Sequence, residues 1–109
     1  MKLVKLQDMT KGWFIGDFEP SIFKSPDFEV AVKEYQAGDK EDWHLHKLAK
    51  EITVILSGKA KMANMDLSHG DIIMLDPGEG TNFEAITDVT TVVVKSPSIM
   101  NDKYLKEDL

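Results

Sequence analysis

A chain of 109 residues, 42% of them hydrophobic, can bury one self-supporting core, and this composition excludes global disorder. The net charge of −6 argues against a nucleic-acid partner and against an anionic membrane surface, because both are bound through clustered Lys and Arg side chains. The absence of cysteine excludes disulfides, thiolate metal sites and a cysteine nucleophile.

Residues 1–27 contain the aromatic-rich stretch GWFIGDFEPSIF, which predicts an N-terminal arm laid over the rest of the domain. The N-terminal residues MKLVKLQDMTKG lack the apolar run of a signal peptide, and no segment reaches the length that spans a bilayer. We therefore expect a cytoplasmic protein. Two alternatives remain for the arm: an edge strand that contributes Trp13, Phe14 and Phe18 to the core, or a segment exchanged between subunits.

Short β-rich runs follow, each bounded by turn residues. FEVAVKEY (28–35) places Phe28, Val30 and Val32 on one face and Glu29 and Lys33 on the other. The next runs are EITVILSG (51–58), KAKMANM (59–65), HGDIIML (69–75), TNFEAI (81–86) and VTTVVVK (89–95). In EITVILSG, Glu51 shares a face with Thr53 and Ile55. Because KAKMANM follows this run at once, residues 57–59 predict a hairpin turn.

Short strands separated by Gly and Pro turns, without a long helical period, predict an all-β sandwich or barrel in a single domain. We expect an arm or edge strand over residues 1–27, a β-barrel core over residues 28–97 and a C-terminal tail over residues 98–109. In the tail, DKYLKEDL has room for one or two helical turns.

The stretch WHLHKLAKE (43–51) carries the residues that point to chemistry. Side chains at i and i+2 of a strand leave the same face, so His44 and His46 can direct two imidazoles into one space. Glu51 starts the next run, and its carboxylate can join the imidazoles if the two strands pair. Two imidazoles and a carboxylate hold Fe(II) and related ions and leave coordination positions open. The alternative is a pair of surface histidines; the third histidine, His69, is expected to be exposed and unrelated.

The spacing in this region resembles the first signature motif of the cupin superfamily. Five, one, four and six residues separate Gly38, His44, His46, Glu51 and Gly58. The resemblance implies a single-domain jelly-roll β-barrel whose two histidines and glutamate bind a metal at the barrel mouth. The blocks WFIGDFEPS and VVKSPSIMNDKY are also similar to small, RmlC-like stand-alone cupins, some found among polysaccharide and nucleotide-sugar enzymes.

GDIIMLDPGEGTNFEA is similar to the second cupin motif, with departures. Its glycines match, and Pro77 is displaced by one position. Thr81 stands in place of the histidine that supplies a further ligand, and Ala85 in place of the usual asparagine. Thr81 and Asn82 are therefore weaker ligand candidates, and strand alternation turns Asn82 away from Thr81.

The predicted cofactor is one divalent transition metal, Fe, Mn, Ni or Zn, held by His44, His46 and Glu51. An inward-facing Glu51 requires a positive partner, since a buried unpaired carboxylate is costly. That partner can be the metal, a protonated histidine or an inward-pointing Lys61.

Three functions are consistent with this site. The first is a metal-dependent enzyme acting on a small polar molecule such as a sugar or sugar derivative, as an isomerase or, with Fe(II), a dioxygenase. The second is a metal-free nucleotide-sugar isomerase or epimerase with His44 or His46 as the general base. Its diphosphate would be held by lysines gathered at the mouth, drawn from Lys33, Lys47, Lys50 and Lys61. The third is a non-catalytic ligand-binding or sensor module.

Candidate bases for the enzyme are Glu34, Tyr35 and Glu84. In each case the expected partner is a small-molecule ligand, with no nucleic acid and no membrane. The resemblance, together with the aromatic arm, predicts a homodimer.

Overall fold

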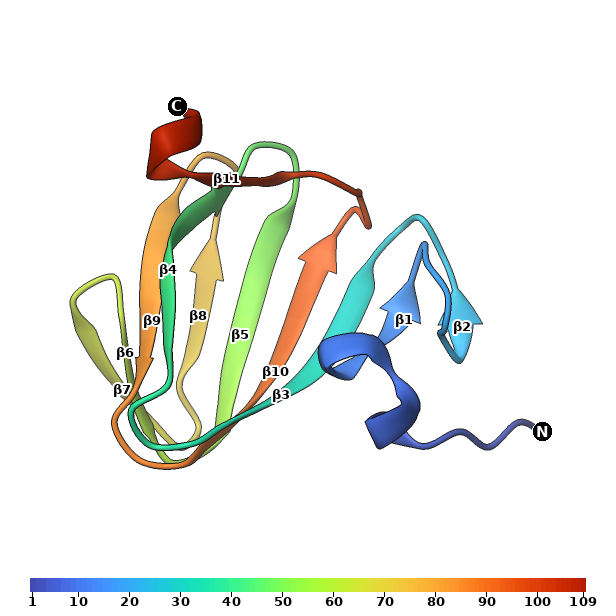
Figure 1. The fold of residues 1–109 in the computed structure, drawn as a ribbon, viewed down its shortest axis with the longest axis horizontal. Helices are drawn as coiled ribbons and strands as arrows, with labels where there is room; N and C mark the ends of the chain where they lie inside the picture. Colours follow the sequence, from blue (N-terminus) through green and yellow to red (C-terminus); the bar gives the residue numbers. More distant parts are fainter.

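Eleven short strands form two facing sheets that curve around a shared interior (Figure 1). The computed structural model describes all residues, 1–109. The six-stranded sheet has the order β2 (Phe23–Lys24), β1 (Trp13–Gly16), β3 (Glu29–Tyr35), β10 (Val89–Ser96), β5 (Lys50–Ser57) and β8 (Ile72–Leu75). The five-stranded sheet has the order β11 (Lys103–Leu105), β4 (Lys40–His46), β9 (Gly80–Ala85), β6 (Lys59–Met62) and β7 (Met65–Ser68). The predicted all-β jelly roll is confirmed.

Three short 3₁₀ helices complete the fold: η1 (Leu6–Asp8), η2 (Thr10–Gly12) and η3 (Lys106–Asp108). All strand pairs are antiparallel except β1 with β2. None of the helices has the length and apolar character needed to cross a bilayer.

The interior between the sheets is apolar at one end and polar at the other. The core cluster is formed by Ile55, Ala60, Met62, Leu67, Phe83, Ala85 and Val89. Along β5, the inward face continues from Ile55 through Thr53, which is also buried, to Glu51. Because side chains alternate along a strand, the residues that place Ile55 in the core also direct Glu51 into the interior.

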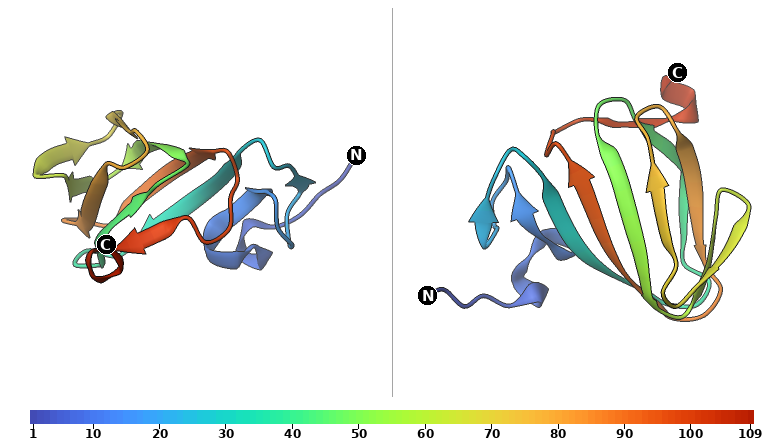
Figure 2. Two further views of the ribbon diagram at one scale, coloured as in Figure 1. Left: turned by 90° about the horizontal axis from the view of Figure 1, so that it is seen from above. Right: turned by 180° about the vertical axis from the view of Figure 1, so that it is seen from behind.

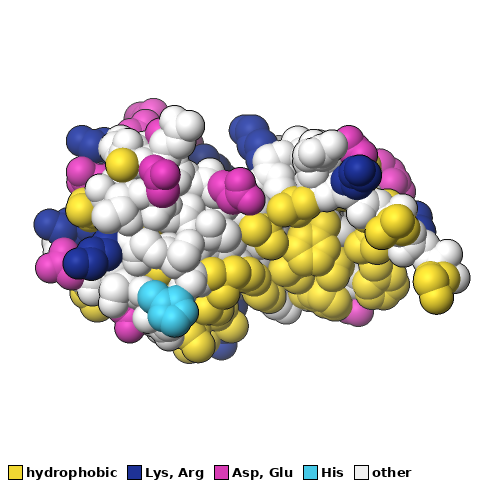
Figure 3. All heavy atoms as spheres, turned by 90° about the horizontal axis from the view of Figure 1, so that it is seen from below, with side chains coloured by type: hydrophobic (Ala, Val, Ile, Leu, Met, Phe, Trp, Pro, Cys, Tyr) yellow, Lys and Arg dark blue, Asp and Glu magenta, His cyan; other side chains and the backbone are white.

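The outer face of the six-stranded sheet is apolar. Across β3, β10, β5 and β8, one row of paired residues is Val32, Val92, Val54 and Ile72, and the next is Val30, Val94, Ile52 and Met74. Ile72 and Met74 are 68% and 52% exposed. Hydrophobic side chains also form an extended band on the face seen from below (Figure 3). Such apolar surfaces are typical of interaction sites, and the homodimer expected from the sequence stays a prediction.

The hairpin turn predicted at residues 57–59 is wrong. Strand β5 pairs with β10 and β8, whereas β6 pairs with β7 and β9, so the chain crosses from one sheet to the other at Gly58. The tight hairpin lies further on, between β6 and β7, where Ala63 and Asn64 have positive φ angles of 48° and 61°. Two consecutive positive φ angles are the signature of a type I′ turn, one of the two turns that commonly close a two-residue hairpin loop.

Strands also form in the predicted arm and tail. Strand β1 pairs with β3, and β2 forms the edge of the six-stranded sheet. Trp13, Phe14 and Phe18 are half-buried, and none belongs to the core cluster. The N-terminal segment lies to the side of the barrel, next to these strands (Figure 2). At the other terminus, β11 pairs with β4, and η3 supplies one helical turn.

Replacing Gly58 by alanine is expected to destabilise the fold more than replacing Gly38. Both glycines have φ near 90° (87° and 92°), where alanine is strained by about 1–2 kcal/mol. A Cβ at Gly58 would also collide with the carbonyl oxygen of Asp88, whereas a Cβ at Gly38 meets open space. In urea denaturation, we expect Gly58→Ala to lower the free energy of unfolding by roughly 3 kcal/mol and Gly38→Ala by about 1 kcal/mol. Equal losses would contradict the steric account of this crossing.

Candidate metal centre

A cavity of about 230 Å³ opens at the polar end of the interior, and both sheets contribute to its lining. The lining includes all three predicted ligands, His44, His46 and Glu51, together with the weaker candidates Thr81 and Asn82. The structure therefore brings the five residues singled out in the sequence to one cavity.

His46 and Glu51 meet across the interior. The Nε2 atom of His46 lies 3.9 Å from the Oε1 atom of Glu51. The rings of His44 and His46 are nearly perpendicular, with centroids 5.4 Å apart. The pairing of these two strands, given above as the condition for this meeting, does not occur: β4 belongs to the five-stranded sheet and β5 to the six-stranded sheet. The carboxylate reaches the imidazoles because the connection between the strands crosses from one sheet to the other.

Backbone carbonyls determine which ring nitrogen of each histidine faces the cavity. The Nδ1 atom of His46 lies 3.1 Å from the carbonyl oxygen of Asp102, and the Nδ1 atom of His44 lies 3.0 Å from that of Asp42. A carbonyl oxygen only accepts, so each Nδ1 carries the hydrogen and the Nε2 of the neutral ring keeps its lone pair. The Nε2 of His46 is buried without a hydrogen-bond partner. A ring held through one nitrogen, with a free lone pair on the other, is the arrangement of a metal-ligating histidine.

Burial disfavours the charged form of both members of the His46–Glu51 pair. Burial, together with the charges of Lys95 and His44, lowers the pKa of His46 to about 4. Burial affects the carboxylate in the opposite direction. It raises the pKa of Glu51, against the opposing effect of Lys95 and His44. A divalent cation favours a neutral imidazole and an ionised carboxylate, so it would remove the cost of ionising Glu51 in this cavity.

The donor set fits a transition metal in its chemistry. Two imidazole nitrogens and a carboxylate oxygen are ligands of the predicted ions. In the structure, no three His, Cys, Asp or Glu side chains converge closely enough to enclose an ion. The three residues thus share a cavity and offer free donor atoms, without forming a closed coordination shell.

Asp102 organises the site and was not identified from the sequence. Its side chain is buried, with 5% of the residue exposed. The carboxylate accepts hydrogen bonds from the backbone N–H groups of Lys47, Leu48 and Ala49, at 2.9–3.2 Å. These residues form the crossing between β4 and β5, so Asp102 holds the crossing with its side chain and His46 with its carbonyl. In the sequence it is one more acidic residue in a polar tail, and no local signal distinguishes it.

The weaker ligand candidates differ in their surroundings. The hydroxyl of Thr81 is buried; it accepts from the N–H of Ala63 at 2.8 Å and donates to the carbonyl of Asn82 at 2.7 Å. Its hydrogen and one of its two lone pairs are therefore already engaged by backbone groups. The side chain of Asn82 is exposed. His69 is exposed and does not line the cavity, as expected.

Most of the lysines expected beside Glu51 or at the mouth of the barrel lie elsewhere. Lys61 is paired with Asp66 on the surface at 3.8 Å, so it does not meet Glu51. Lys50 pairs with Asp76, and Lys47 lies over the ring of Tyr104. The cavity is lined instead by Lys11, Lys33, Lys95 and Lys103. Of the four lysines proposed for the mouth, only Lys33 lies there.

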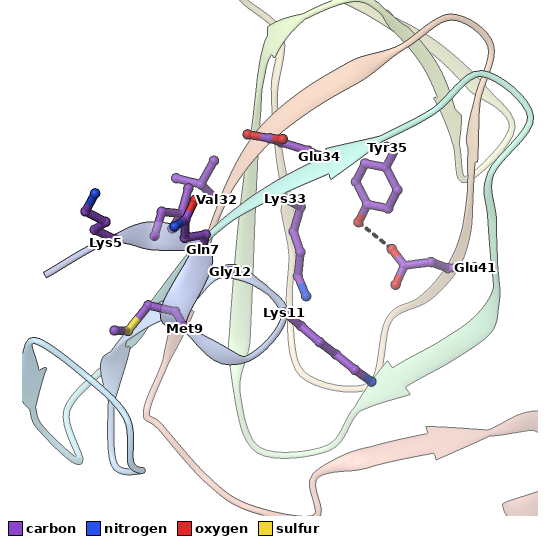
Figure 4. Close-up of a pocket in the computed structure, with 11 residues that line it drawn as sticks. Lys5, Gln7, Met9, Lys11, Gly12, Val32, Lys33, Glu34, Tyr35 and Glu41 are labelled. Carbon is purple, nitrogen blue, oxygen red and sulfur yellow. Dashed lines mark hydrogen bonds between the residues drawn. The ribbon is translucent and has the colours of Figure 1, made fainter.

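Of the candidate bases, only Tyr35 lines the cavity. Its hydroxyl donates to the Oε1 atom of Glu41 at 2.7 Å, and the pair joins β3 of one sheet to β4 of the other (Figure 4). Burial and this carboxylate raise the pKa of Tyr35, so the phenol stays protonated and acts as a donor. Glu34 is exposed, and Glu84 does not line the cavity.

Asp102→Ala is expected to lower the free energy of unfolding by roughly 2–4 kcal/mol, because three backbone N–H groups, one buried and two partly buried, lose a charged acceptor. Asp42→Ala is the matched control. The Asp42 carbonyl also binds a histidine Nδ1, but its side chain is exposed and makes no hydrogen bond. Urea denaturation of both variants tests this role, and a similar small loss in each would count against it.

The stability of chelator-treated protein is expected to fall as the pH falls from about 6.5 towards 4. The unfolded chain binds a proton at His46 near its ordinary pKa of 6.5, whereas the folded protein binds it only near 4. Acid therefore favours unfolding through His46, by up to about 1.4 kcal/mol per pH unit. The raised pKa of Glu51 acts in the opposite direction: it contributes stability at low pH that is lost as the pH rises through the folded pKa. His46→Gln should show a smaller loss than the parent across this window; parallel curves would show that His46 is not the group responsible.

Comparison with known proteins finds similarity at the level of structure alone. No family model matches the chain, and no curated protein matches it. A conserved uncharacterised protein with a double-stranded β-helix domain from Klebsiella pneumoniae has a TM-score of 0.68 and 22% identity, covering 77% of this chain and 74% of that one. The DMSP lyase DddQ from Ruegeria pomeroyi has a TM-score of 0.72 and 20% identity, covering 97% and 60%.

A third similar structure is a sugar phosphate isomerase from a cupin superfamily, from Silicibacter pomeroyi. It has a TM-score of 0.61 and 22% identity, covering 64% of this chain and 50% of that one. At these identities the likeness concerns the fold. Together with the two sheets and their strand order, it shows that this chain has the double-stranded β-helix, or jelly-roll, fold of the cupins.

Proposed function

We propose that this protein binds one divalent transition metal (Fe, Mn, Ni or Zn) through His44, His46 and Glu51, and that it is an enzyme acting on a small polar molecule such as a sugar derivative. The observation that carries the proposal is the buried Nε2 of His46, which has no hydrogen-bond partner and lies 3.9 Å from the Glu51 carboxylate. An unsatisfied buried acceptor beside a carboxylate is costly without a cation.

When bound, the metal would act as a Lewis acid that polarises a carbonyl or hydroxyl oxygen of the ligand. The chain's own groups would orient that ligand. The phenol of Tyr35, held by Glu41, presents a protonated donor at the same cavity, and the lysines supply positive charge. The similar structures include a sugar phosphate isomerase and a lyase, which supports reactions of this class.

The metal-free alternative is less well supported for His46. A general base works best when its pKa is near the working pH, and burial holds the pKa of His46 at about 4. In that alternative, His44 would have to act as the base. If ligands bind the metal-loaded protein and none is converted to a product, the protein is a non-catalytic binding module.

Protein purified without chelators is expected to contain about one transition metal per chain, measured by elemental analysis. His46→Ala and Glu51→Gln should each weaken metal affinity by at least roughly 10- to 100-fold. Added metal should stabilise the parent, by about 2.7 kcal/mol at a hundred times its dissociation constant. Glu34→Gln is the control, because Glu34 is exposed and lies outside the cavity.

Two results would overturn the proposed centre. One is a parent protein that carries no metal and gains no thermal stability from added Fe, Mn, Ni or Zn. The other is an unchanged metal content in both His46→Ala and Glu51→Gln.

A further inference from the structure

The charged groups of the candidate cavity are mainly cationic, although the chain is acidic. The net charge of the chain is −6. The cavity, however, is lined by four lysines and two glutamates: Lys11, Lys33, Lys95, Lys103, Glu41 and Glu51. Charges of one sign gathered on a concave surface focus the potential and attract ligands of the opposite sign. A bound divalent metal would add to this positive charge.

Lys33 is half-buried and forms no salt bridge, although the charge of Glu41 lies close enough to act on it. The Lys–carboxylate pairs of the structure involve Lys50, Lys61 and Lys95, and none involves Lys33. The neighbouring carboxylate of Glu41 is engaged by the Tyr35 hydroxyl, and the Lys33 side chain extends into the opening beside that pair (Figure 4). A partly desolvated ammonium without a partner is unfavourable, and a bound anion would satisfy it.

Trp13 holds two of the lysines in place. The Nζ atoms of Lys33 and Lys95 lie 5.1 Å and 4.8 Å from the centroid of the Trp13 ring. Lys95 also pairs with Glu29 at 3.6 Å, so a carboxylate already balances its charge. Lys33 is held by the same ring without a direct salt bridge, so its ammonium can still bind an anionic ligand.

Lys33 also lies at the junction of two cavities. A larger cavity of about 710 Å³ runs beneath the N-terminal segment (Figure 4). It shares Lys11, Lys33, Tyr35 and Glu41 with the cavity of the candidate metal centre. A ligand that extends from the metal donors into the larger cavity would therefore pass Lys33.

We infer that the ligand of this site carries an anionic group, a carboxylate or a phosphate, and that Lys33 binds this group at the junction of the two cavities. The inference rests on the proposed function for the position of the metal-bound end of the ligand. The anion site depends only on the lysines. All 13 basic side chains of the protein are lysines, so the group is held by ammonium point charges, which accept either anion, and not by a planar guanidinium fork.

The test compares three sugars that share a ring and differ at C6: glucose, glucuronate and glucose 6-phosphate. Binding to the protein purified without chelators is measured by calorimetry. We expect at least one anionic sugar to bind 10- to 100-fold more tightly than glucose, the range that one charge-assisted hydrogen bond supports. Lys33→Gln should remove that preference without changing the metal content. Lys61→Gln, which removes a surface lysine outside the cavity, should leave the preference intact.

The two anionic sugars separate a carboxylate site from a phosphate site. The inference is overturned if both bind no better than glucose, if neither binds, or if Lys33→Gln keeps the preference. Its failure is distinct from failure of the metal centre. Protein that lacks metal but prefers an anion through Lys33 refutes the proposed function alone, and metal-loaded protein without that preference refutes the anion site alone.

Discussion

The candidate site depends on the buried carboxylate of Asp102. This side chain accepts the N–H groups of the crossing between β4 and β5, and its own carbonyl accepts from His46 Nδ1. One residue of the C-terminal segment thus holds the turn that carries the chain from one sheet to the other and also orients a candidate ligand. If the crossing moved, His46 and Glu51 would no longer face each other, because they lie at its two ends.

The interior of this barrel changes character along its length. One end holds aliphatic side chains and Phe83, and the other holds imidazoles, carboxylates and ammonium groups. The same strands supply both, since β5 runs from Glu51 to Ile55 on one inward face. The apolar end provides the hydrophobic stabilisation, and this allows the polar end to keep groups that are individually unfavourable. Buried groups that have shifted pKa values and lack a hydrogen-bond partner are a common feature of functional sites.

The distribution of charge supports both proposals in different ways. Burial lowers the pKa of His46 and raises that of Glu51, and a bound divalent cation would offset the cost of ionising this carboxylate. Lys33 stays unpaired in the same cavity, which suits an anionic ligand. A cation at one end and an ammonium at the other would hold a small polar anion in one orientation, a requirement for efficient catalysis.

The sequence by itself determined the periodic features of this protein. Alternation placed His44 with His46, and Glu51 with Thr53 and Ile55, because the period of a strand is a local property of the backbone. Turn residues marked most strand boundaries for the same reason. Which sheet each strand joins is not a local property, and so the hairpin at residues 57–59 was wrongly predicted. For the same reason, the sequence could give the pairing of β4 with β5 only as a condition, and this pairing does not form.

Only the tertiary structure decided which face of β3 is inside. Its alternation is clear from the sequence, but an apolar face normally points inward, and here Val30 and Val32 lie outside while Lys33 lines the cavity. Burial depends on the strands that cover a face, and these come from distant parts of the chain. The same holds for Asp102, whose partners lie more than 50 residues away. The local pattern determines which side chains share a face of a strand, and long-range packing determines which residues that face contacts.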